Sequence, residues 1–219
     1  MGQYNSVFDI IGPVMIGPSS SHTAGAARIG KVIRRILGEQ PDSVDIYLYE
    51  SFAKTYRGHG TDIALVGGLL GMEPDDDRLS QSLKIAHEKG MEVAFIPKVE
   101  KADHPNQAKM VLKTKDRTMT CTGISIGGGA IQISELNGFK INLDFSTPTY
   151  ITFHQDKPGV VANVTRLLSE RSINISTMTL TREAKGEKAM MIIEVDNRVE
   201  GLLDSLRKID YIDAVDFFN

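Results

Sequence analysis

The residues from Tyr150 to the C-terminus carry the pattern that most constrains the fold. Val160, Val161, Val164, Leu167 and Leu168 recur at the spacing of one buried helix face. Alternating or short apolar segments before and after this helix are typical of strands. The expected strands are 150–154, 174–181, 189–195 and 214–218, and the second expected helix is 199–209. This order, β-α-β-β-α-β, predicts the split βαβ, ferredoxin-like fold.

The segment Asn142–Thr149, which contains Pro148 and other turn formers, marks a boundary before this part. Upstream of it the pattern is mixed, and we expect an α+β or mixed α/β layer structure. The expected helices are 21–37, 61–70 and 79–89, and the expected strands are 44–49 and 92–96, followed by β-prone segments to Asn142. The sequence therefore predicts two domains, 1–145 and 150–219.

The chain of 219 residues contains a single cysteine, Cys121, which excludes an intrachain disulfide, a Cys-based zinc site and an iron–sulfur cluster ligated by this chain alone. Its 25 basic and 28 acidic residues give a formal net charge of −3, so no basic surface points to nucleic acid. No apolar run approaches the roughly 20 residues that span a bilayer. We therefore expect a soluble cytoplasmic protein without a membrane or nucleic-acid partner.

Five consecutive hydrogen-bonding side chains lie where a loop enters the first predicted helix. They are Ser19, Ser20, Ser21, His22 and Thr23. A helix N-terminus presents unpaired N–H groups and partial positive charge, which suit a carboxylate or phosphate. A histidine there can exchange a proton near neutral pH. A plain N-cap needs only one serine, so a ligand site and a redundant cap with a surface histidine both stay open.

A second histidine, His59, stands between two glycines in the sequence Arg57-Gly-His-Gly-Thr-Asp62. Glycine allows backbone angles closed to other residues, so a tight loop here can present the imidazole outward. Thr61 or Asp62 can cap the helix that follows. A dinucleotide fingerprint would need a third glycine where Ile63 stands. An ordinary turn is the simpler interpretation of this motif taken alone.

Two further features have structural interpretations. Gly127-Gly128-Gly129 is not followed by Gly-Lys-Ser/Thr, so we expect a hairpin bend or bulge rather than a P-loop. Cys121 lies in a Thr-rich, β-prone run and is expected to be packed in the core. His87 and His104 have no partners at metal-ligand spacing. The sequence therefore predicts no metal site in this chain.

The segment Ser6–Gly25 (SVFDIIGPVMIGPSSSHTAG), followed by Gly58-His-Gly-Thr-Asp62, resembles the β subunit of the bacterial iron–sulfur L-serine dehydratases. The resemblance covers essentially the whole chain, and its Ser-Ser-Ser-His-Thr element is specific to that family. From Tyr150 the chain resembles an ACT domain, through Asp156-Lys-Pro-Gly159 and Ile173-Asn-Ile175. The resemblance implies a serine dehydratase β-chain domain, similar to allosteric substrate-binding domains, at 1–145 and an ACT domain at 150–219.

This resemblance implies the elimination of water from L-serine, which gives an enamine that becomes pyruvate and ammonia. It also implies a [4Fe–4S] cluster, one iron of which lacks a protein thiolate and acts as a Lewis acid on the leaving hydroxyl. Such a cluster needs three or four thiolates, and this chain has one cysteine. The implied partner is a cysteine-bearing α subunit, without which the chain would be inactive.

The resemblance also implies roles for the two histidine motifs. His22 and His59 become the candidate catalytic residues, with His59 as an acid–base or substrate-contact group. The candidate substrate-binding residues are Ser19, Ser20, Ser21, Thr23, Thr61 and Asp62. The residue that removes the α-proton is not assigned.

In the ACT part, His154 and Asn174 fall where serine-sensing ACT domains place ligand contacts across a paired module. Asp156 stands where such domains often carry Asn, and Gly159 completes the candidate ligand or interface set. Gly159 and Asn174 have an equally good structural interpretation, as residues of a tight loop and a turn. Self-association through this part stays open, as does an alternative function as a stand-alone amino-acid-sensing protein without catalysis.

Overall fold

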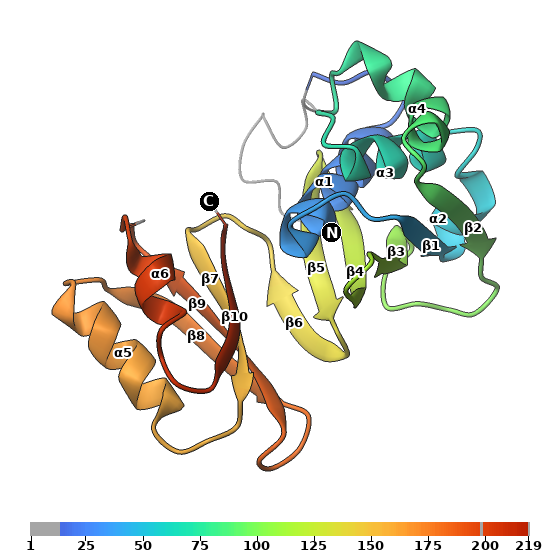
Figure 1. Ribbon diagram of the computed structural model, residues 1–219. Helices are drawn as coiled ribbons and strands as arrows, with labels where there is room; N and C mark the ends of the chain where they lie inside the picture. The colour runs from blue at the N-terminus through green and yellow to red at the C-terminus, as the bar shows by residue number, and fades with distance from the viewer. Residues whose placement is uncertain (1–13, 198, 219) are drawn as a thin grey trace. The chain divides into compact units, whose positions relative to one another are not determined.

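A computed structural model describes residues 14–197 and 199–218. The chain divides after Asp144 into two compact units, whose helices and strands are labelled in Figure 1. Each unit has its own sheet and its own helices, so the α+β class is confirmed. Within the described residues, no helix has the length and apolar character needed to cross a membrane.

The first unit begins with a π-helical turn, Ser20–Gly25, that runs directly into helix α1, Ala26–Leu37. The other helices are α2 (Glu50–Thr55), α3 (Thr61–Leu69) and α4 (Ser82–Glu88), the last preceded by a 3₁₀ turn, Asp77–Gln81. The strands are β1 (Ser43–Leu48), β2 (Glu92–Pro97), β3 (Gln107–Lys113), β4 (Thr118–Gly127), β5 (Ala130–Leu136) and β6 (Phe139–Leu143).

These six strands form one sheet in the order β2-β1-β3-β4-β5-β6, in which only β1 and β2 run parallel. Side chains alternate along β1, where Val44, Ile46 and Leu48 are buried and the residues between them are half-buried. One face of the sheet is therefore apolar and buried, and the opposite face of β1 is half-buried. Helix α1 packs on β4 and β5 at the apolar face, with Ile29 lying directly over Gly123.

Helices α1 and α3 touch backbone to backbone. A Cβ atom at Gly30 would lie 2.2 Å from the carbonyl oxygen of Leu65, and one at Gly68 would lie 2.0 Å from that of Ala27. Both distances are far below van der Waals contact, so any side chain at these positions would push the helices apart. The two glycines therefore fix how closely the helices approach each other.

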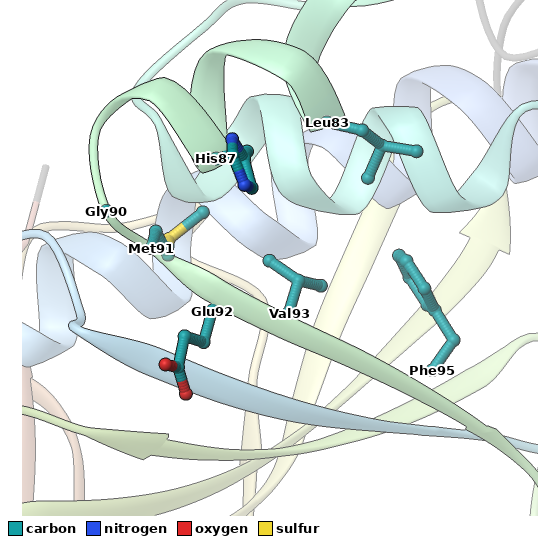
Figure 2. A pocket seen from close by; sticks show the side chains of 7 residues that line it. All are labelled: Leu83, His87, Gly90, Met91, Glu92, Val93 and Phe95. Atoms are coloured by element: carbon teal, nitrogen blue, oxygen red, sulfur yellow. The ribbon is translucent and has the colours of Figure 1, made fainter.

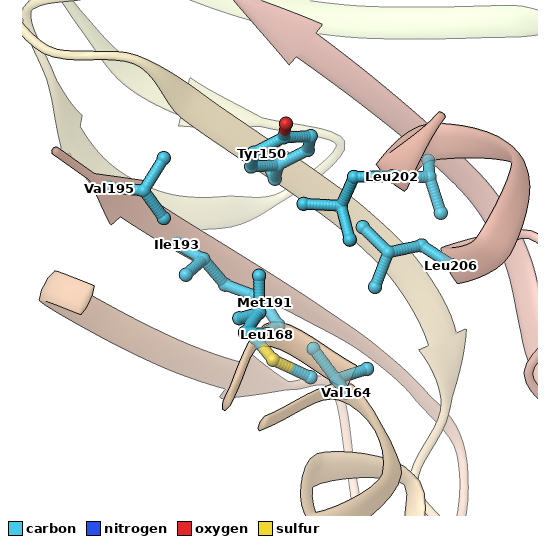
Figure 3. Packing of buried hydrophobic residues seen from close by; sticks show 9 residues of the cluster. Tyr150, Val164, Leu168, Met191, Ile193, Val195, Leu202 and Leu206 are labelled. Carbon is cyan, nitrogen blue, oxygen red and sulfur yellow. The ribbon is translucent and has the colours of Figure 1, made fainter. Parts of the chain in front are cut away.

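The second unit has the element order and the sheet order of the split βαβ fold. Its elements are β7 (Thr149–Gln155), α5 (Val160–Glu170), β8 (Ile175–Arg182), β9 (Lys188–Val195), α6 (Leu202–Leu206) and β10 (Ile212–Phe218). The strands pair antiparallel in the order β10-β7-β9-β8. Tyr150 of β7 and alternate residues of β9, including Met191, pack with Leu168 of α5 and Leu206 of α6 in one apolar cluster (Figure 3). This is the expected ferredoxin-like arrangement.

Several boundaries differ from those expected. The predicted helix 21–37 begins with a π-helical turn, and the start of the predicted helix 79–89 is the 3₁₀ turn. The predicted helix 199–209 shrinks to α6, because Gly201 takes a left-handed conformation with φ 72° directly before it. Helix α2 was not expected, since its six residues are too few to show helical periodicity. The glycine triplet 127–129 does form the turn between β4 and β5, at positive φ throughout.

Candidate active site

The two histidine motifs meet in the structure. The ring centroids of His22 and His59 lie 5.0 Å apart, with an interplanar angle of 75°. His22 belongs to the π-helical turn before α1, and His59 to the loop before α3. Since α1 and α3 pack closely together, the starts of these two helices carry both imidazoles into one place.

Ser19 caps the π-helical turn. Its Oγ accepts a hydrogen bond from the backbone N–H of His22 at 3.2 Å, and its carbonyl oxygen accepts one from Thr23 at 2.9 Å. The turn ends at Gly25, where a Cβ atom would lie 2.1 Å from Oγ of Ser125 on β4. The cap by Ser19 and the absence of a side chain at Gly25 therefore determine the position of the turn that carries His22. π-Helical turns are frequent at functional sites.

The imidazole of His22 is buried, and hydroxyl groups contact both of its nitrogens. Nδ1 lies 3.0 Å from Oγ of Ser21 and 3.4 Å from Oγ of Ser19. Nε2 lies 3.0 Å from Oγ of Ser51. The ring of Phe52 packs edge-on against the imidazole, with centroids 5.1 Å apart. Burial, and next the nearby His59, lower the pKa of His22, so its ring is neutral at neutral pH.

His59 differs from His22 in that its side chain is exposed. Its loop is nevertheless held at the backbone, because the N–H of His59 donates to the carbonyl of Thr55 at 2.9 Å and its own carbonyl accepts from Oγ1 of Thr23 at 3.2 Å. Gly60 follows in the left-handed region, at φ 69°. The backbone is therefore fixed while the imidazole stays accessible, which suits a group that exchanges protons with a bound molecule.

The predicted substrate-binding residues fall into two sets. Ser19, Ser20 and Ser21 are half-buried beside His22, and the backbone N–H groups of Ser20 and Ser21 have no acceptor among the described residues. Such free N–H groups at a helix start favour an anion. Thr23, in contrast, is buried, and its hydroxyl donates a hydrogen bond to the carbonyl of His59.

Thr61 and Asp62 do not cap α3 as expected. Thr61 is the first helical residue, fully buried, and its hydroxyl has no partner among the described residues. Asp62 accepts a hydrogen bond from the N–H of Ile63, and burial raises the pKa of its carboxyl group. The N-cap position belongs to the left-handed Gly60, so the helix starts one residue earlier than capping by Thr61 would require.

Sequence reasoning missed Ser51, Phe52 and Ser125. Ser51 and Phe52 lie on the short helix α2, directly after the buried strand β1. Ser125 is fully buried beside Gly25, and its hydroxyl has no partner among the described residues. The one available signal was a serine placed just after a buried strand, where functional side chains gather in sheets with parallel strands.

A pocket of about 620 Å³ lies away from the histidine pair, between α4 and the edge strand β2 (Figure 2). Leu83 and His87 face it from α4, and Val93 and Phe95 from β2. Its lining is mostly apolar, and Glu92 is the one carboxylate in it. The pocket therefore lacks the converging hydroxyls and imidazoles of the site around His22.

In the second unit, the candidate ligand residues lie at both ends of α5. His154, at the end of β7, is buried, and this burial lowers the pKa of its imidazole. Asp156 accepts hydrogen bonds from Arg182 and from the N–H of Gly186, both at 2.9 Å. Gly159, with φ 94°, precedes α5, whereas Asn174 follows it and donates to Asp196 at 2.9 Å. One copy of the unit thus does not bring Asn174 together with the others.

The described residues contain no group of three or more His, Cys, Asp or Glu side chains that could hold a metal ion. Cys121 is fully buried in β4, and burial raises the pKa of its thiol, so it is packed in the core as expected. A single buried thiol does not fit an iron–sulfur cluster. The site of this chain consists of imidazole, hydroxyl and backbone N–H groups.

A mixed-sheet unit with a histidine pair at the starts of two helices, followed by a unit of the split βαβ fold, defines a two-part α+β chain with an ACT-like C-terminal domain. The family model described as "AHAS small subunit-like ACT domain" matches residues 151–213, and the model described as "Serine dehydratase beta chain" matches residues 6–88. The second match contains both histidine motifs; its residues 6–13, part of the segment that carried the resemblance, lie outside the described residues.

Three relatives support the same assignment. The chain is 47% identical to the "Probable L-serine dehydratase, beta chain" of Bacillus subtilis (strain 168), over 96% of both chains. It is 37% identical to the "L-serine dehydratase, beta chain" of Peptoniphilus asaccharolyticus, over 91% of both. It is 31% identical to the "L-serine dehydratase" of Haemophilus influenzae, covering 77% of this chain and 44% of that one. The chain belongs to the serine dehydratase beta-chain family, and these relatives favour that reading over a stand-alone sensor.

Proposed function

We propose that this chain is the β chain of an L-serine dehydratase, which eliminates water from L-serine to give pyruvate and ammonia. The observation that carries the proposal is the meeting of a buried imidazole, His22, and an exposed one, His59, beside a run of serines at a helix start. In the reaction the Cα–H and Cβ–OH bonds break and a C=C bond forms. The enamine then tautomerises to an imine, which one water molecule hydrolyses.

The substrate carboxylate binds at the start of the π-helical turn. There the N–H groups of Ser20 and Ser21, which have no acceptor among the described residues, supply donors for an anion together with the nearby serine hydroxyls. His22 is not available for this purpose, because Ser21 and Ser51 hold its nitrogens. The serines at this turn therefore bind the substrate carboxylate, and His22 orients the groups around it.

His59 exchanges a proton with the bound substrate or with the leaving water. Its ring is exposed while its loop is held by the Thr23 and Thr55 hydrogen bonds, so the imidazole can reach a ligand without losing its position. An imidazole is the side chain most often used for general acid–base catalysis.

The [4Fe–4S] cluster implied by the family does not fit the residues of this chain, since Cys121 is single and buried. We therefore assign the cluster to a cysteine-bearing α subunit and expect the isolated β chain to be inactive. The Haemophilus relative, of which this chain covers less than half, supports this division, because it has room for a second part on one polypeptide. No step at the residues of this chain depends on the cluster.

The C-terminal ACT domain serves self-association, with or without a bound amino acid. His154, Asp156 and Gly159 of one copy and Asn174 of another form the candidate ligand or interface set. The separation of these residues along α5 supports a pairing of two copies.

The decisive experiment is to express the chain anaerobically with its α subunit and to measure pyruvate formed from L-serine. We expect activity from the complex and none from either chain alone. Calorimetry with L-serine on the isolated chain gives the contrasting result for a sensor: tight binding without any partner, and no pyruvate from the complex, would overturn the proposal.

A further inference from the structure

Ser51, the second residue of α2, occupies the imidazole nitrogen of His22 that faces away from the serine run. Its Oγ lies 3.0 Å from Nε2 of His22. Among the described residues this is the one hydrogen bond that the hydroxyl makes. Ser51 lies outside both sequence motifs of the site, on an element between them.

The backbone around Ser51 is held on both sides. Its N–H donates to the carbonyl of Pro105 at 2.9 Å, and its carbonyl accepts from Oγ1 of Thr55 at 2.8 Å. The preceding residue, Glu50, has a φ of 42°, which is uncommon for a residue with a side chain, and its carboxylate accepts from the N–H of Ala102 at 3.1 Å. Such conformations persist where surrounding contacts over-determine them, often at functional sites. The hydroxyl therefore has a fixed position.

A neutral imidazole has one donor nitrogen and one acceptor nitrogen. Ser21 contacts Nδ1 at 3.0 Å and Ser51 contacts Nε2 at 3.0 Å, so both nitrogens are used and a flip of the ring would break both contacts. Phe52, the neighbour of Ser51 on α2, closes on the same ring with a centroid distance of 5.1 Å. Helix α2 thus holds His22 by a hydrogen bond and a ring contact at once.

The orientation of His22 passes to His59 through direct contact. The two rings meet at 5.0 Å and 75°, and Thr23, the next residue after His22, holds the carbonyl of His59. A His22 ring that turned or tilted would remove the surface on which the exposed His59 ring rests.

We infer that Ser51 is a positioning residue, whose hydroxyl fixes the angle of the His22 ring and, through that ring, the orientation of His59. Its catalytic consequence rests on the proposed function, whereas its contact with the His22 ring does not. Ser51 itself does not touch the substrate.

The activity test uses the αβ complex with Ser51→Ala, Ser51→Thr and a control, Ser80→Ala, which makes the same change at an exposed serine of the 3₁₀ turn before α4. We expect Ser51→Ala to lower kcat by about 10-fold to 100-fold with little change in KM, the size of effect that a misplaced catalytic group produces. Ser51→Thr, which keeps the hydroxyl, should recover most of the rate, and Ser80→Ala should retain it. An unchanged kcat in Ser51→Ala overturns the inference.

The second readout is the ¹⁵N spectrum of the histidine rings in the full β chain at neutral pH. The Nε2 resonance of His22 should keep its position in Ser51→Thr and should move in Ser51→Ala, because the alanine removes the hydrogen-bond partner of that nitrogen. If Ser51→Ala does not fold, Ser51→Cys keeps the size with a weaker hydrogen-bonding group and replaces it. An Nε2 resonance that stays in place in the variant refutes the inference. If the parent complex makes no pyruvate, the proposed function fails, while this spectrum still decides the role of Ser51.

Discussion

The imidazoles of His22 and His59 meet edge to face, with ring centroids 5.0 Å apart, although helix α1, strand β1 and helix α2 separate them in sequence. One ring is buried with both nitrogens occupied, and the other is exposed on a loop with a fixed backbone. This difference is the basis of the proposed division of roles, in which His22 orients its surroundings and His59 exchanges protons.

Replacing His59 by alanine should lower kcat of the αβ complex by about 10²-fold to 10⁴-fold, the usual contribution of a general acid or base. Pyruvate release from L-serine is the measurement. His87→Ala is the matched control, because it removes another exposed histidine, on α4 rather than at the site. Turnover in His59→Ala equal to that of the control would remove His59 from the mechanism.

Stability should rise with pH through the titration of His22. Burial and the neighbouring His59 lower the pKa of His22 from 6.5, so below that value the unfolded chain binds a proton that the folded chain rejects. The stabilising contribution is complete above the unfolded pKa of about 6.5 and is lost as the pH falls toward the lowered folded value. His22→Gln should flatten this slope in urea unfolding between about pH 5.5 and 7.5.

His87→Gln serves as the control for this slope and should leave it intact. His104 and His154, whose pKa values burial also lowers, account for the slope that remains in His22→Gln. A slope that is the same with and without the His22 imidazole would contradict the prediction.

Gly68→Ala should destabilise the first unit. Alanine favours a helix over glycine by up to about 1 kcal/mol, but the new Cβ would lie 2.0 Å from the carbonyl oxygen of Ala27. Overpacking of this kind costs about 1–3 kcal/mol or more, so we expect a net loss of stability in urea unfolding. Gly58→Ala, whose Cβ would meet only the carbonyl of Thr55 at 3.8 Å, should change the free energy of unfolding little. Equal stabilities of the two variants would show that the helices can separate freely.

Thr61→Val should leave the stability of the chain unchanged or raise it by up to about 1 kcal/mol, because a buried hydroxyl without a partner contributes only its desolvation cost. Thr61 is fully buried, and its Oγ1 has no partner among the described residues. A clear loss of stability would mean that this hydroxyl is bonded in solution. The KM of the same variant tests its assignment to substrate binding: an unchanged KM removes Thr61 from that set.

If two copies of the ACT domain share a ligand, variants of the two ends of α5 should complement each other. Asp156→Ala and Asn174→Ala should each abolish any rise in Tm caused by L-serine. Mixed after unfolding and refolding together, they should restore about one quarter of the sites, since random pairing gives half mixed dimers with one intact site each. No restoration would place the ligand, if any, within a single copy.

The fold of the second unit was predictable because its periodicities are long and its strands few. The apolar spacing in Val160–Leu168 and the alternation around Met191 gave both the elements and their order. The first unit was predictable only as a mixed α+β layer. Its helix α2 is too short for a periodic pattern, and the π-helical turn packs at Gly25 against Ser125, which is distant in sequence.

Both histidine motifs could be found in the sequence, but their relation to each other could not. Taken alone, Gly58-His-Gly60 reads as an ordinary turn, and only the packing of α3 on α1 brings it to His22. The caps expected at Thr61 and Asp62 were wrong, since a left-handed Gly60 leaves the cap position without a side chain. The contact between Ser51 and His22 exists only in the folded chain and leaves no pattern in the sequence. A serine that follows a strand is too common to be singled out as a site residue.

The glycine contact between α1 and α3 is a pivot, and the site lies on one side of it, at the starts of the two helices. Gly30 lies eight positions after His22, and Gly68 lies seven positions after Thr61. At about 1.5 Å per residue, the start of each helix is therefore about 10 Å from the pivot. A change of about 5° in the crossing angle of the helices then moves their starts by about 1 Å relative to each other. A displacement of this size in an active site can lower the rate about 100-fold. A contact that moves the C-terminal ends of α1 and α3 therefore also changes the positions of the site residues at their starts.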